Sequence, residues 1–168
     1  DKAEKRGRAH VGRSESRYAD LLYDFRASEG LAQYPNANST MRLTYGNVQP
    51  LNPSDGVHYD SRSTIAGYME KYNPDEYEYR VDDRMRRLIA KRDWGRWGES
   101  GTLYVNFLTD NDITGGNSGS PVLDGRGHLI GLAFDGNRES MAGDVWFHPE
   151  LARTVCVDIR YVMWVIDK

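Results

Sequence analysis

The stretch "ITGGNSGSPVLDG", residues 113 to 125, places two glycines, a serine and a further glycine directly before an apolar segment. Glycine reaches positive φ at little steric cost, so such a run can curl with its backbone amides turned inward. A serine hydroxyl needs amides of this kind, together with a neighbouring base, before it can act as a nucleophile. Plain hairpin connections have the same composition, and a short G-x-S-G match therefore leaves both interpretations open.

The sequence around this stretch predicts β-structure. Residues 102–111, TLYVNFLTDN, predict a strand that leads toward the serine. Residues 120–136, SPVLDGRGHLIGLAFDG, predict two strands joined by a tight turn at Asp124-Gly125. Residues 154–166, TVCVDIRYVMWVI, continue the β pattern, and we expect them to end as a helix.

Two other segments have the apolar spacing of helices. From Arg17 onward the apolar residues fall on one helical face, and Gly30 suits the left-handed residue that ends such a helix. Further along, Asp82 or Asp83 can cap a second helix that ends near Gly95. The apolar faces of the two helices consist of Tyr18, Leu21, Leu22 and Phe25, and of Met85, Leu88 and Ile89.

The segments between these helices predict loops and short strands. We expect a turn-rich loop over residues 34–40 and a half-buried strand over residues 41–48. A loop over residues 50–56 follows, and residues 57–72 predict a short strand followed by either a turn or one helical turn. The alternation that predicts the strand sets Met41, Leu43 and Tyr45 against Arg42 and Thr44.

The composition of the 168-residue chain is that of a globular protein with one domain's worth of sequence. Basic residues are scattered and the formal charge is −3, which argues against nucleic acid as a partner. No apolar run of about 18 residues is present, so no membrane span is expected. Cys156 is the single cysteine, and the valines beside it predict a buried thiol rather than a disulfide or a zinc ligand.

Four longer motifs, one of which contains the serine turn, resemble the bacterial dipeptidyl-peptidase 7/11 group, the S46 serine peptidases. The segments that carry the resemblance are NDITGGNSGSPV (111–122), LIGLAFDGN (129–137), VDIRYVMWVIDK (157–168) and NANSTMRLTYG (36–46). The resemblance implies a mainly β fold: the C-terminal half of a chymotrypsin-like double β-barrel, with short helices and a helical N-terminal extension. It also implies a division into residues 1–33, the tail of a helical domain, and residues 34–168, the peptidase barrel.

The same resemblance implies roles for individual residues. Ser118 is expected to be the acylated nucleophile, and the amides of Gly116 and Ser118 are expected to form the oxyanion hole. Asp135 is expected to bind the substrate's N-terminal amine, although a turn-forming aspartate is the alternative. Gly136 is expected to line the S1 pocket. Asn117 stands where many chymotrypsin-like enzymes carry an aspartate that receives a newly cut N-terminal amine, so that route of activation is not expected here.

The S1 pocket is expected to be apolar. In the S46 family, glycine at the position of Gly136 accompanies bulky or aliphatic P1 residues, whereas arginine there accompanies acidic ones. Leu132, Ala133 and Phe134 precede Gly136 and are apolar. Arg138 is close in sequence and keeps an acidic P1 residue open as an alternative.

No histidine of this chain is predicted to be the general base. In the family, the catalytic His and Asp lie in the N-terminal half of a much longer chain, and nothing here matches those segments. The chain opens on DKAEKRGRAH, without an initiator methionine or a signal region, and is expected to be an excised piece that is inactive alone. Its histidines are His10, His58, His128 and His148.

The expected function is that of a serine exopeptidase that releases dipeptides from the N-termini of oligopeptides. Its partners are the peptide substrate and the N-terminal half of the same enzyme, and no metal or cofactor is implied. The family resemblance alone implies a periplasmic or cell-surface location and a homodimeric full-length enzyme. Two alternatives remain open: an endopeptidase of the same fold, and a non-catalytic barrel that binds peptides.

Overall fold

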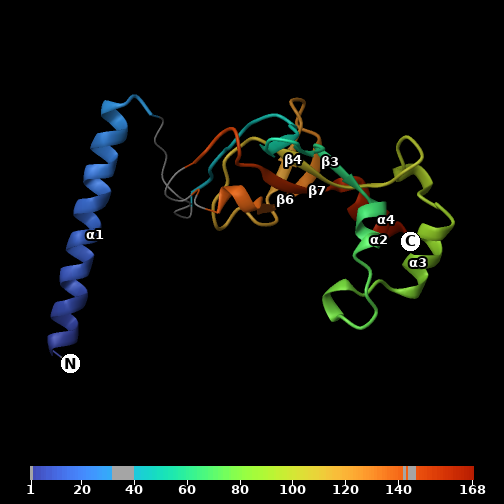
Figure 1. The fold of residues 1–168 in the computed structure, drawn as a ribbon, viewed down its shortest axis with the longest axis horizontal. Coiled ribbons are helices and arrows are strands. Elements are labelled where there is room, and N and C mark those ends of the chain that lie inside the picture. Colours follow the sequence, from blue (N-terminus) through green and yellow to red (C-terminus); the bar gives the residue numbers. More distant parts are fainter. Residues whose placement is uncertain (1, 32–39, 142, 144–146) are drawn as a thin grey trace. The chain divides into compact units, whose positions relative to one another are not determined.

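The computed structural model describes residues 2–31, 40–141, 143 and 147–168, with two compact units over residues 1–40 and 41–168 (Figure 1). The first unit contains α1 (Lys2–Ser28), and the second contains every other element. The boundary expected at residue 33/34 lies outside the described residues. The elements of the second unit are β1 (Leu51–Ser54), β2 (Val57–Tyr59), β3 (Arg62–Thr64), α2 (Ile65–Glu70), η1 (Tyr77–Tyr79), α3 (Asp83–Ala90), η2 (Gly95–Trp97), β4 (Tyr104–Thr109), β5 (Pro121–Leu123), β6 (Leu129–Gly136), η3 (Arg138–Ser140), β7 (Thr154–Asp158) and α4 (Ile159–Asp167).

Helix α1 ends as its sequence predicts. Gly30 takes a φ of +68°, and the amide of Leu31 donates to the carbonyl of Arg26 at 2.9 Å. This left-handed residue closes the last turn because it brings an amide back to a carbonyl that the helix leaves unpaired. Tyr18 and Phe25 on the apolar face are more than half exposed.

A five-stranded antiparallel sheet in the order β3-β4-β7-β6-β5 forms the centre of the second unit. The expected strands over residues 102–111, 120–136 and 154–166 correspond to β4, to the β5–β6 hairpin and to β7 followed by α4. The fold of this unit is therefore mainly β. The sheet has open edges at β3 and β5, as expected for half of a barrel.

The face of the sheet that carries Phe107 is buried. Phe107 on β4 pairs with Cys156 on β7, which pairs in turn with Ala133 on β6, and each is less than a tenth exposed. Cys156 is therefore the buried thiol that its valine neighbours predict, and burial raises its pKa. A Cβ at Gly131 would lie 2.7 Å from the Phe107 ring, so close packing requires glycine there.

Short helices gather at the end of the sheet where α4 begins (Figure 1). Trp164 on α4 is fully buried, and its ring meets Trp94 edge-on with centroids 5.8 Å apart. The Trp164 indole nitrogen donates to the carbonyl of Asp93 at 2.9 Å. The rest of this hydrophobic cluster consists of Ile65, Leu103, Met85, Leu88, Ile89, Trp97, Val105 and Tyr161.

Helix α3 begins as expected and ends earlier than expected. Asp82 is its N-cap, because one of its carboxylate oxygens accepts from the amides of Arg84 and Met85. The last helical residue is Ala90, and Arg92 takes a φ of +52°. The helix therefore stops before Gly95, since a left-handed residue other than glycine already reverses the chain.

Two other expectations for the early part of the second unit are wrong. Residues 50–56 are not a loop: they contain β1, which an Asp55-Gly56 turn joins to β2. Residues 41–48 form no strand of the sheet, and only Val48 makes an isolated bridge, to Thr109. The predicted turn-rich loop over residues 34–40 lies almost wholly outside the described residues.

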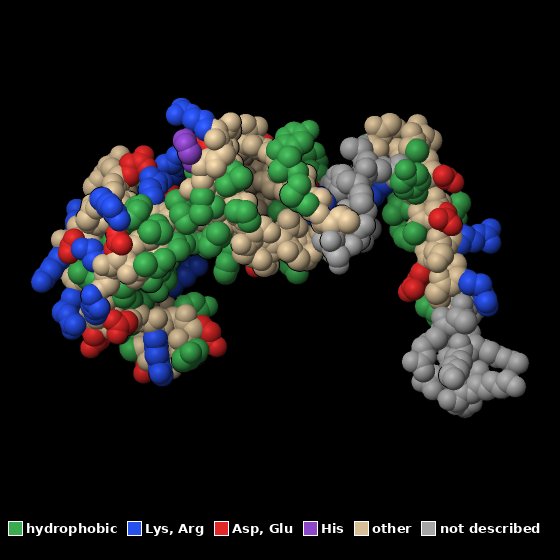
Figure 2. Space-filling model, turned by 180° about the vertical axis from the view of Figure 1, so that it is seen from behind, with side chains coloured by type: hydrophobic (Ala, Val, Ile, Leu, Met, Phe, Trp, Pro, Cys, Tyr) green, Lys and Arg blue, Asp and Glu red, His purple; other side chains and the backbone are tan. Residues whose placement is uncertain are grey.

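The side chains of residues 41–45 also point the opposite way from the prediction. The apolar ones are 97%, 85% and 89% exposed, whereas the polar ones between them are half-buried. The polar ones turn inward because their hydrogen-bond partners, Thr114, Asn117 and Asn111, lie in the loop before β5. Hydrophobic side chains reach the surface in many places on the face of this unit seen in Figure 2. Within residues 41–45 the exposed apolar residues are Met41, Leu43 and Tyr45.

Candidate active site

Ser118 lies at the surface, in the turn-rich loop that connects β4 to β5. The loop is closed by the amide of Asn117, which donates to the carbonyl of Thr114, and by the amide of Ser120, which donates to the carbonyl of Asn117. Gly116 and Gly119 take φ values of +102° and +80°. These two positions require glycine because other side chains rarely adopt such a backbone.

Several amides of this loop have no acceptor among the described residues, and those of Gly116 and Ser118 lie on either side of Asn117. In the part of the chain that the structure describes, the amides of Gly116 and Ser118 find no hydrogen-bond acceptor. The amide of Asn117, between them, is used within the turn. Alternate unpaired amides at a surface serine are what an oxyanion hole needs, because both can donate to one oxygen that develops negative charge.

The serine turn is fastened to β6. The amide of Gly119 donates to the carbonyl of Ala133 at 2.8 Å, and the amide of Ala133 donates to the carbonyl of Ser120 at 2.9 Å. Asp135 follows two residues later on the same strand. The structure therefore brings the predicted residues Gly116, Ser118, Asp135 and Gly136 onto two neighbouring segments.

A β-bulge turns Asp135 outward. Ala133 pairs with Cys156 and is buried, whereas Asp135 pairs with Val155, so Phe134 is the extra residue. Without the bulge Asp135 would lie on the buried face with Ala133, because side chains alternate with a period of two. Asp135 is exposed, and its carboxylate accepts from the amide of Gly136 at 2.8 Å.

Gly136 lies against η3. A Cβ built there would be 2.4 Å from the hydroxyl oxygen of Ser140, which itself donates to the carbonyl of Asn137 at 2.7 Å. Phe134 is 63% exposed. The end of β6 thus offers an exposed aromatic ring, a carboxylate and a position without a side chain.

Two of the described histidines, His58 and His128, contact side chains other than Ser118. His58, on β2, contacts the side chains of Asn52 and Asp60. His128 lies at the far end of the β5–β6 hairpin and contacts Asp124 at 3.1 Å. The backbone amide of His128 is the main reason that the pKa of Asp124 lies below its usual value, and the amide of Arg126 adds to the effect. No described residue hydrogen-bonds to the Ser118 hydroxyl.

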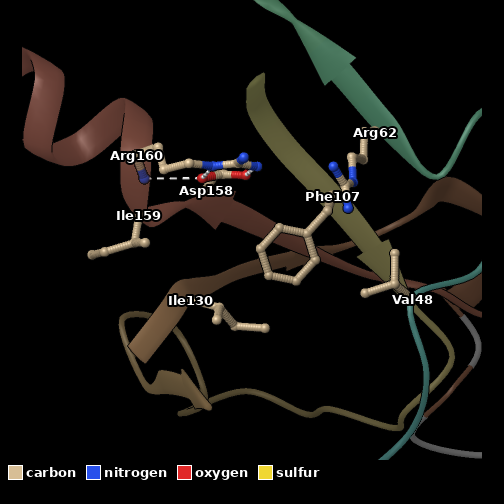
Figure 3. Close-up of a pocket in the computed structure, with 7 residues that line it drawn as sticks. All are labelled: Val48, Arg62, Phe107, Ile130, Asp158, Ile159 and Arg160. Carbon is tan, nitrogen blue, oxygen red and sulfur yellow. Dashed lines mark hydrogen bonds and ion pairs between the residues drawn. The ribbon is translucent and has the colours of Figure 1, made fainter. Parts of the chain in front are cut away.

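A cavity of about 240 Å³ opens elsewhere on the sheet, beside the start of α4 (Figure 3). Apolar side chains form one part of its wall and the ionic side chains of Arg62, Asp158 and Arg160 form the other. Neither Ser118 nor the end of β6 lines it. Its apolar lining residues are Val48, Phe107, Ile130 and Ile159.

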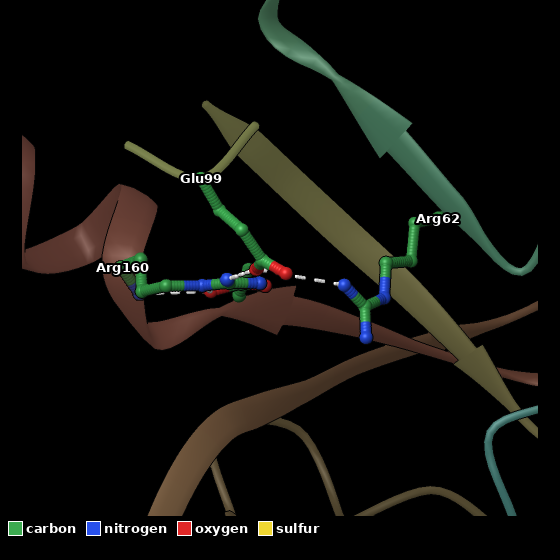
Figure 4. A network of polar contacts seen from close by, with 4 residues as sticks. Arg62, Glu99 and Arg160 are labelled. Carbon is green, nitrogen blue, oxygen red and sulfur yellow. Dashed lines mark hydrogen bonds and ion pairs between the residues drawn. The ribbon is translucent and has the colours of Figure 1, made fainter. Parts of the chain in front are cut away.

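The ionic wall of this cavity is internally paired (Figure 4). Arg160 makes an ion pair with the buried Asp158, with a nitrogen–oxygen distance of 2.6 Å, and contacts Glu99. Glu99 also lies 3.7 Å from Arg62. Asp158 raises the pKa of Arg160 above its usual value, chiefly through their hydrogen bonds. Since Asp158 also caps α4, this network joins the helix to the sheet rather than presenting free charge to a ligand.

Sequence reasoning missed one residue beside the serine turn. Arg42 reaches the turn from residues 41–49 and donates to Thr114 and Asn117, each at 3.1 Å. Its position in an alternating segment shows that it shares a face with Thr44, but only the contacts show that this face is the inner one. The described residues contain no group of three side chains suited to hold a metal ion.

Comparison with known proteins assigns the chain to a family of peptidases. The family model described as Peptidase S46 matches residues 1–168, and the chain belongs to this family. Dipeptidyl-peptidase 7 of Porphyromonas gingivalis is 50% identical over 139 residues, which are 83% of this chain and 20% of that protein. The Asp/Glu-specific dipeptidyl-peptidase of Capnocytophaga gingivalis is 48% identical over 136 residues, which are 80% of this chain and 19% of that protein.

Solved structures agree with this assignment. The crystal structure of Porphyromonas endodontalis DPP11 in complex with the dipeptide Arg-Glu matches with a TM-score of 0.78 and 43% identity. The match covers 89% of this chain and 21% of that chain. The chain thus spans about a fifth of the length of the relatives it matches. None of the described helices is long and apolar enough to cross a membrane.

Proposed function

We propose that the complete protein is a serine dipeptidyl-peptidase that releases dipeptides from the N-termini of oligopeptides, with Ser118 as its nucleophile. The observation that carries the proposal is the surface serine whose loop leaves the Gly116 and Ser118 amides unpaired, fastened to a strand that ends in an exposed carboxylate. Relatives at about half identity are named dipeptidyl-peptidases, which supports the reaction class.

The proposed reaction is acyl transfer. The Ser118 oxygen attacks the carbonyl carbon of the second residue, and the developing oxyanion accepts from the amides of Gly116 and Ser118. The peptide C–N bond then breaks, the leaving amine takes the serine proton through a base, and water hydrolyses the ester. The base and its carboxylate partner are proposed to come from outside this chain, which agrees with the side chains of His58 and His128 contacting Asn52 and Asp124.

Asp135 is proposed to bind the substrate's free α-amine. A dipeptidyl-peptidase must measure the distance from the N-terminus to the scissile bond, and a carboxylate fixes the ammonium by a charge-assisted hydrogen bond. The bulge at Phe134 supports this role, because it turns Asp135 out of the buried face at a point two residues beyond the contact with the serine turn.

The exchange Asp135→Asn in the complete protein should raise KM for dipeptidyl substrates about 10- to 100-fold, since it removes the charge while keeping the shape. Steady-state kinetics on dipeptidyl p-nitroanilides measures the effect. Asp75→Asn, an exposed aspartate on the loop before α3, is the matched control and should change nothing. An unchanged KM for Asp135→Asn would remove this role.

Gly136 is proposed to line the S1 pocket without presenting a charged side chain to an apolar P1 residue, while the Ser140 hydroxyl fills the direction of its missing Cβ. Phe134 supplies exposed apolar surface beside it, and burying a P1 side chain there contributes about 1.5–3 kcal/mol. A relative named dipeptidyl-peptidase 7 and one named Asp/Glu-specific dipeptidyl-peptidase are 50% and 48% identical to this chain, so overall identity does not decide the P1 preference. An apolar P1 residue is favoured because glycine at residue 136 presents no charged group to an acidic P1 side chain.

Blocking the substrate's N-terminus tests the proposal. The complete protein should cleave a dipeptidyl p-nitroanilide with a free amine and fail on the same substrate after acetylation, because the blocked amine carries no charge for Asp135. The 168-residue chain alone should cleave neither, since it lacks the base. Equal cleavage of both substrates would identify an endopeptidase. Peptide binding without any cleavage would identify a non-catalytic barrel.

A further inference from the structure

Arg42 connects the serine turn to a segment 75 residues earlier in the chain. Its side chain is half-buried, and one guanidinium nitrogen donates to the hydroxyl of Thr114 and to the side-chain oxygen of Asn117, each at 3.1 Å. Two hydrogens on one nitrogen can serve two acceptors at once. Arg42 therefore holds two residues of the serine turn in a fixed relation to each other.

Asn117 is the residue through which this contact reaches the unpaired amides. Its side-chain oxygen also accepts from the amide of Thr114 at 3.1 Å, and its own amide donates to the carbonyl of Thr114 at 3.2 Å. Asn117 lies between Gly116 and Ser118 in the chain. The peptide group after Asn117 carries the Ser118 amide, and the Gly116 amide lies one peptide group before the Asn117 amide, so an anchor on Asn117 restrains the chain that holds both.

The segment that carries Arg42 is fastened to the same loop on its other side. The amide of Asn47 donates to the carboxylate of Asp110 at 2.6 Å, and the amide of Asp110 donates to the carbonyl of Asn47 at 3.1 Å. At Gly46 a Cβ would lie 2.3 Å from the same carboxylate, so the backbones approach closely. These contacts hold the backbone of the segment that carries Arg42 against the residues that follow β4.

We propose that Arg42 is a positioning residue for the oxyanion hole: it anchors Asn117 and thereby holds the Gly116 and Ser118 amides in the arrangement that receives negative charge. A permanent cation donating to a neutral amide gives a charge-assisted hydrogen bond, which is stronger than a neutral one. The anchor is part of the chain itself, so the turn is ordered without a newly cut N-terminal amine. The inference rests on the proposed role of Ser118.

The side-chain pattern of residues 41–45 agrees with this role. In an extended segment, placing Arg42 and Thr44 at the loop forces the residues between them outward, and Leu43 is 85% exposed as a result. The half-buried side of the segment therefore makes polar contacts with the serine turn, whereas its apolar side chains lie on the exposed side.

Kinetics of the complete protein tests the inference, with Arg42→Ala, Arg42→Lys and Asn117→Ala as variants. Arg42→Ala should lower kcat about 30- to 300-fold with KM changed by no more than about three-fold, because the oxyanion exists only in the transition state. Arg42→Lys should recover part of the loss, since an ammonium can reach one of the two acceptors. Asn117→Ala should cause a similar loss without altering the arginine.

A double-mutant cycle separates positioning from simple loss of structure. Arg42→Ala combined with Asn117→Ala should be no slower than the worse single variant by more than about three-fold, because both remove one contact. Thermal unfolding of each variant reports the folded fraction, and Arg84→Ala, an exposed arginine on α3, should match the wild type. Unchanged kcat in Arg42→Ala, or multiplicative losses in the cycle, would overturn the inference while leaving Ser118 as nucleophile. Full activity in Ser118→Ala would refute both proposals.

Discussion

Replacing Ser118 with alanine in the complete protein is expected to lower kcat by about 10⁴- to 10⁶-fold. The exchange removes the oxygen that would carry the acyl group, whereas the amides of Gly116 and residue 118 remain to polarise the carbonyl. KM should change little, because the hydroxyl is a small part of the contact with the substrate. Release of p-nitroaniline from a free-amine dipeptidyl substrate measures the effect.

The control for this exchange is Ser63→Ala, which alters an exposed serine on β3 at the edge of the sheet. This variant should keep the wild-type rate. Thermal unfolding should show that both variants are folded, since Ser118 is itself at the surface and makes no described side-chain hydrogen bond. A Ser118→Ala protein that retains even a tenth of the wild-type kcat would show that another group is the nucleophile.

The exchange Gly136→Arg should have the second largest effect, on specificity. A guanidinium at the end of β6 would pair with an acidic P1 side chain and leave an apolar one facing a buried charge. The ratio of kcat/KM for an acidic over an apolar P1 residue should rise about 10²- to 10⁴-fold. Matched dipeptidyl p-nitroanilides that differ only in the P1 residue measure the ratio.

The structure also predicts a steric cost for this exchange. Any Cβ at residue 136 would meet the hydroxyl oxygen of Ser140 at 2.4 Å, so Gly136→Arg should lower activity on all substrates. Gly136→Ala carries the same clash without the charge and is the matched control: it should lose rate without changing preference. Ser140→Gly combined with Gly136→Arg should recover rate and keep the acidic preference. If Gly136→Arg leaves the P1 ratio as it was, residue 136 does not line the S1 pocket.

The parts of the fold that the sequence predicts well depend on short-range signals. The turn at Asp124-Gly125 and the cap at Asp82 are each determined by residues within a few positions, and both elements form as expected. The buried thiol of Cys156 follows from its immediate neighbours in the same way. In each case local chemistry and tertiary packing favour the same conformation.

The errors occur where distant partners decide the outcome. The alternation over residues 41–48 shows which side chains share a face, but a period of two does not show which face is buried. Thr114 and Asn117, more than 70 residues away in sequence, bring Arg42 inward. The bulge at Phe134 is also invisible in the sequence, because it depends on the register between β6 and β7.

For the candidate site, the sequence indicates the residue types and the structure supplies their arrangement. The glycines around Ser118 predict a curled backbone, and the positive φ values of Gly116 and Gly119 confirm this prediction. That the turn contacts β6 at Ala133, and so lies near Asp135, is a tertiary fact that no local pattern contains.

The most direct test of the account is to label the complete protein with a fluorophosphonate, which reacts with an activated serine oxygen as fluoride leaves. Peptide mass spectrometry should find the phosphonate on Ser118, and labelling should slow in Arg42→Ala because the amides that hold the phosphoryl oxygen are less well ordered. A protein that cleaves dipeptidyl substrates but carries the label on another residue, or carries none at Ser118, would contradict the account.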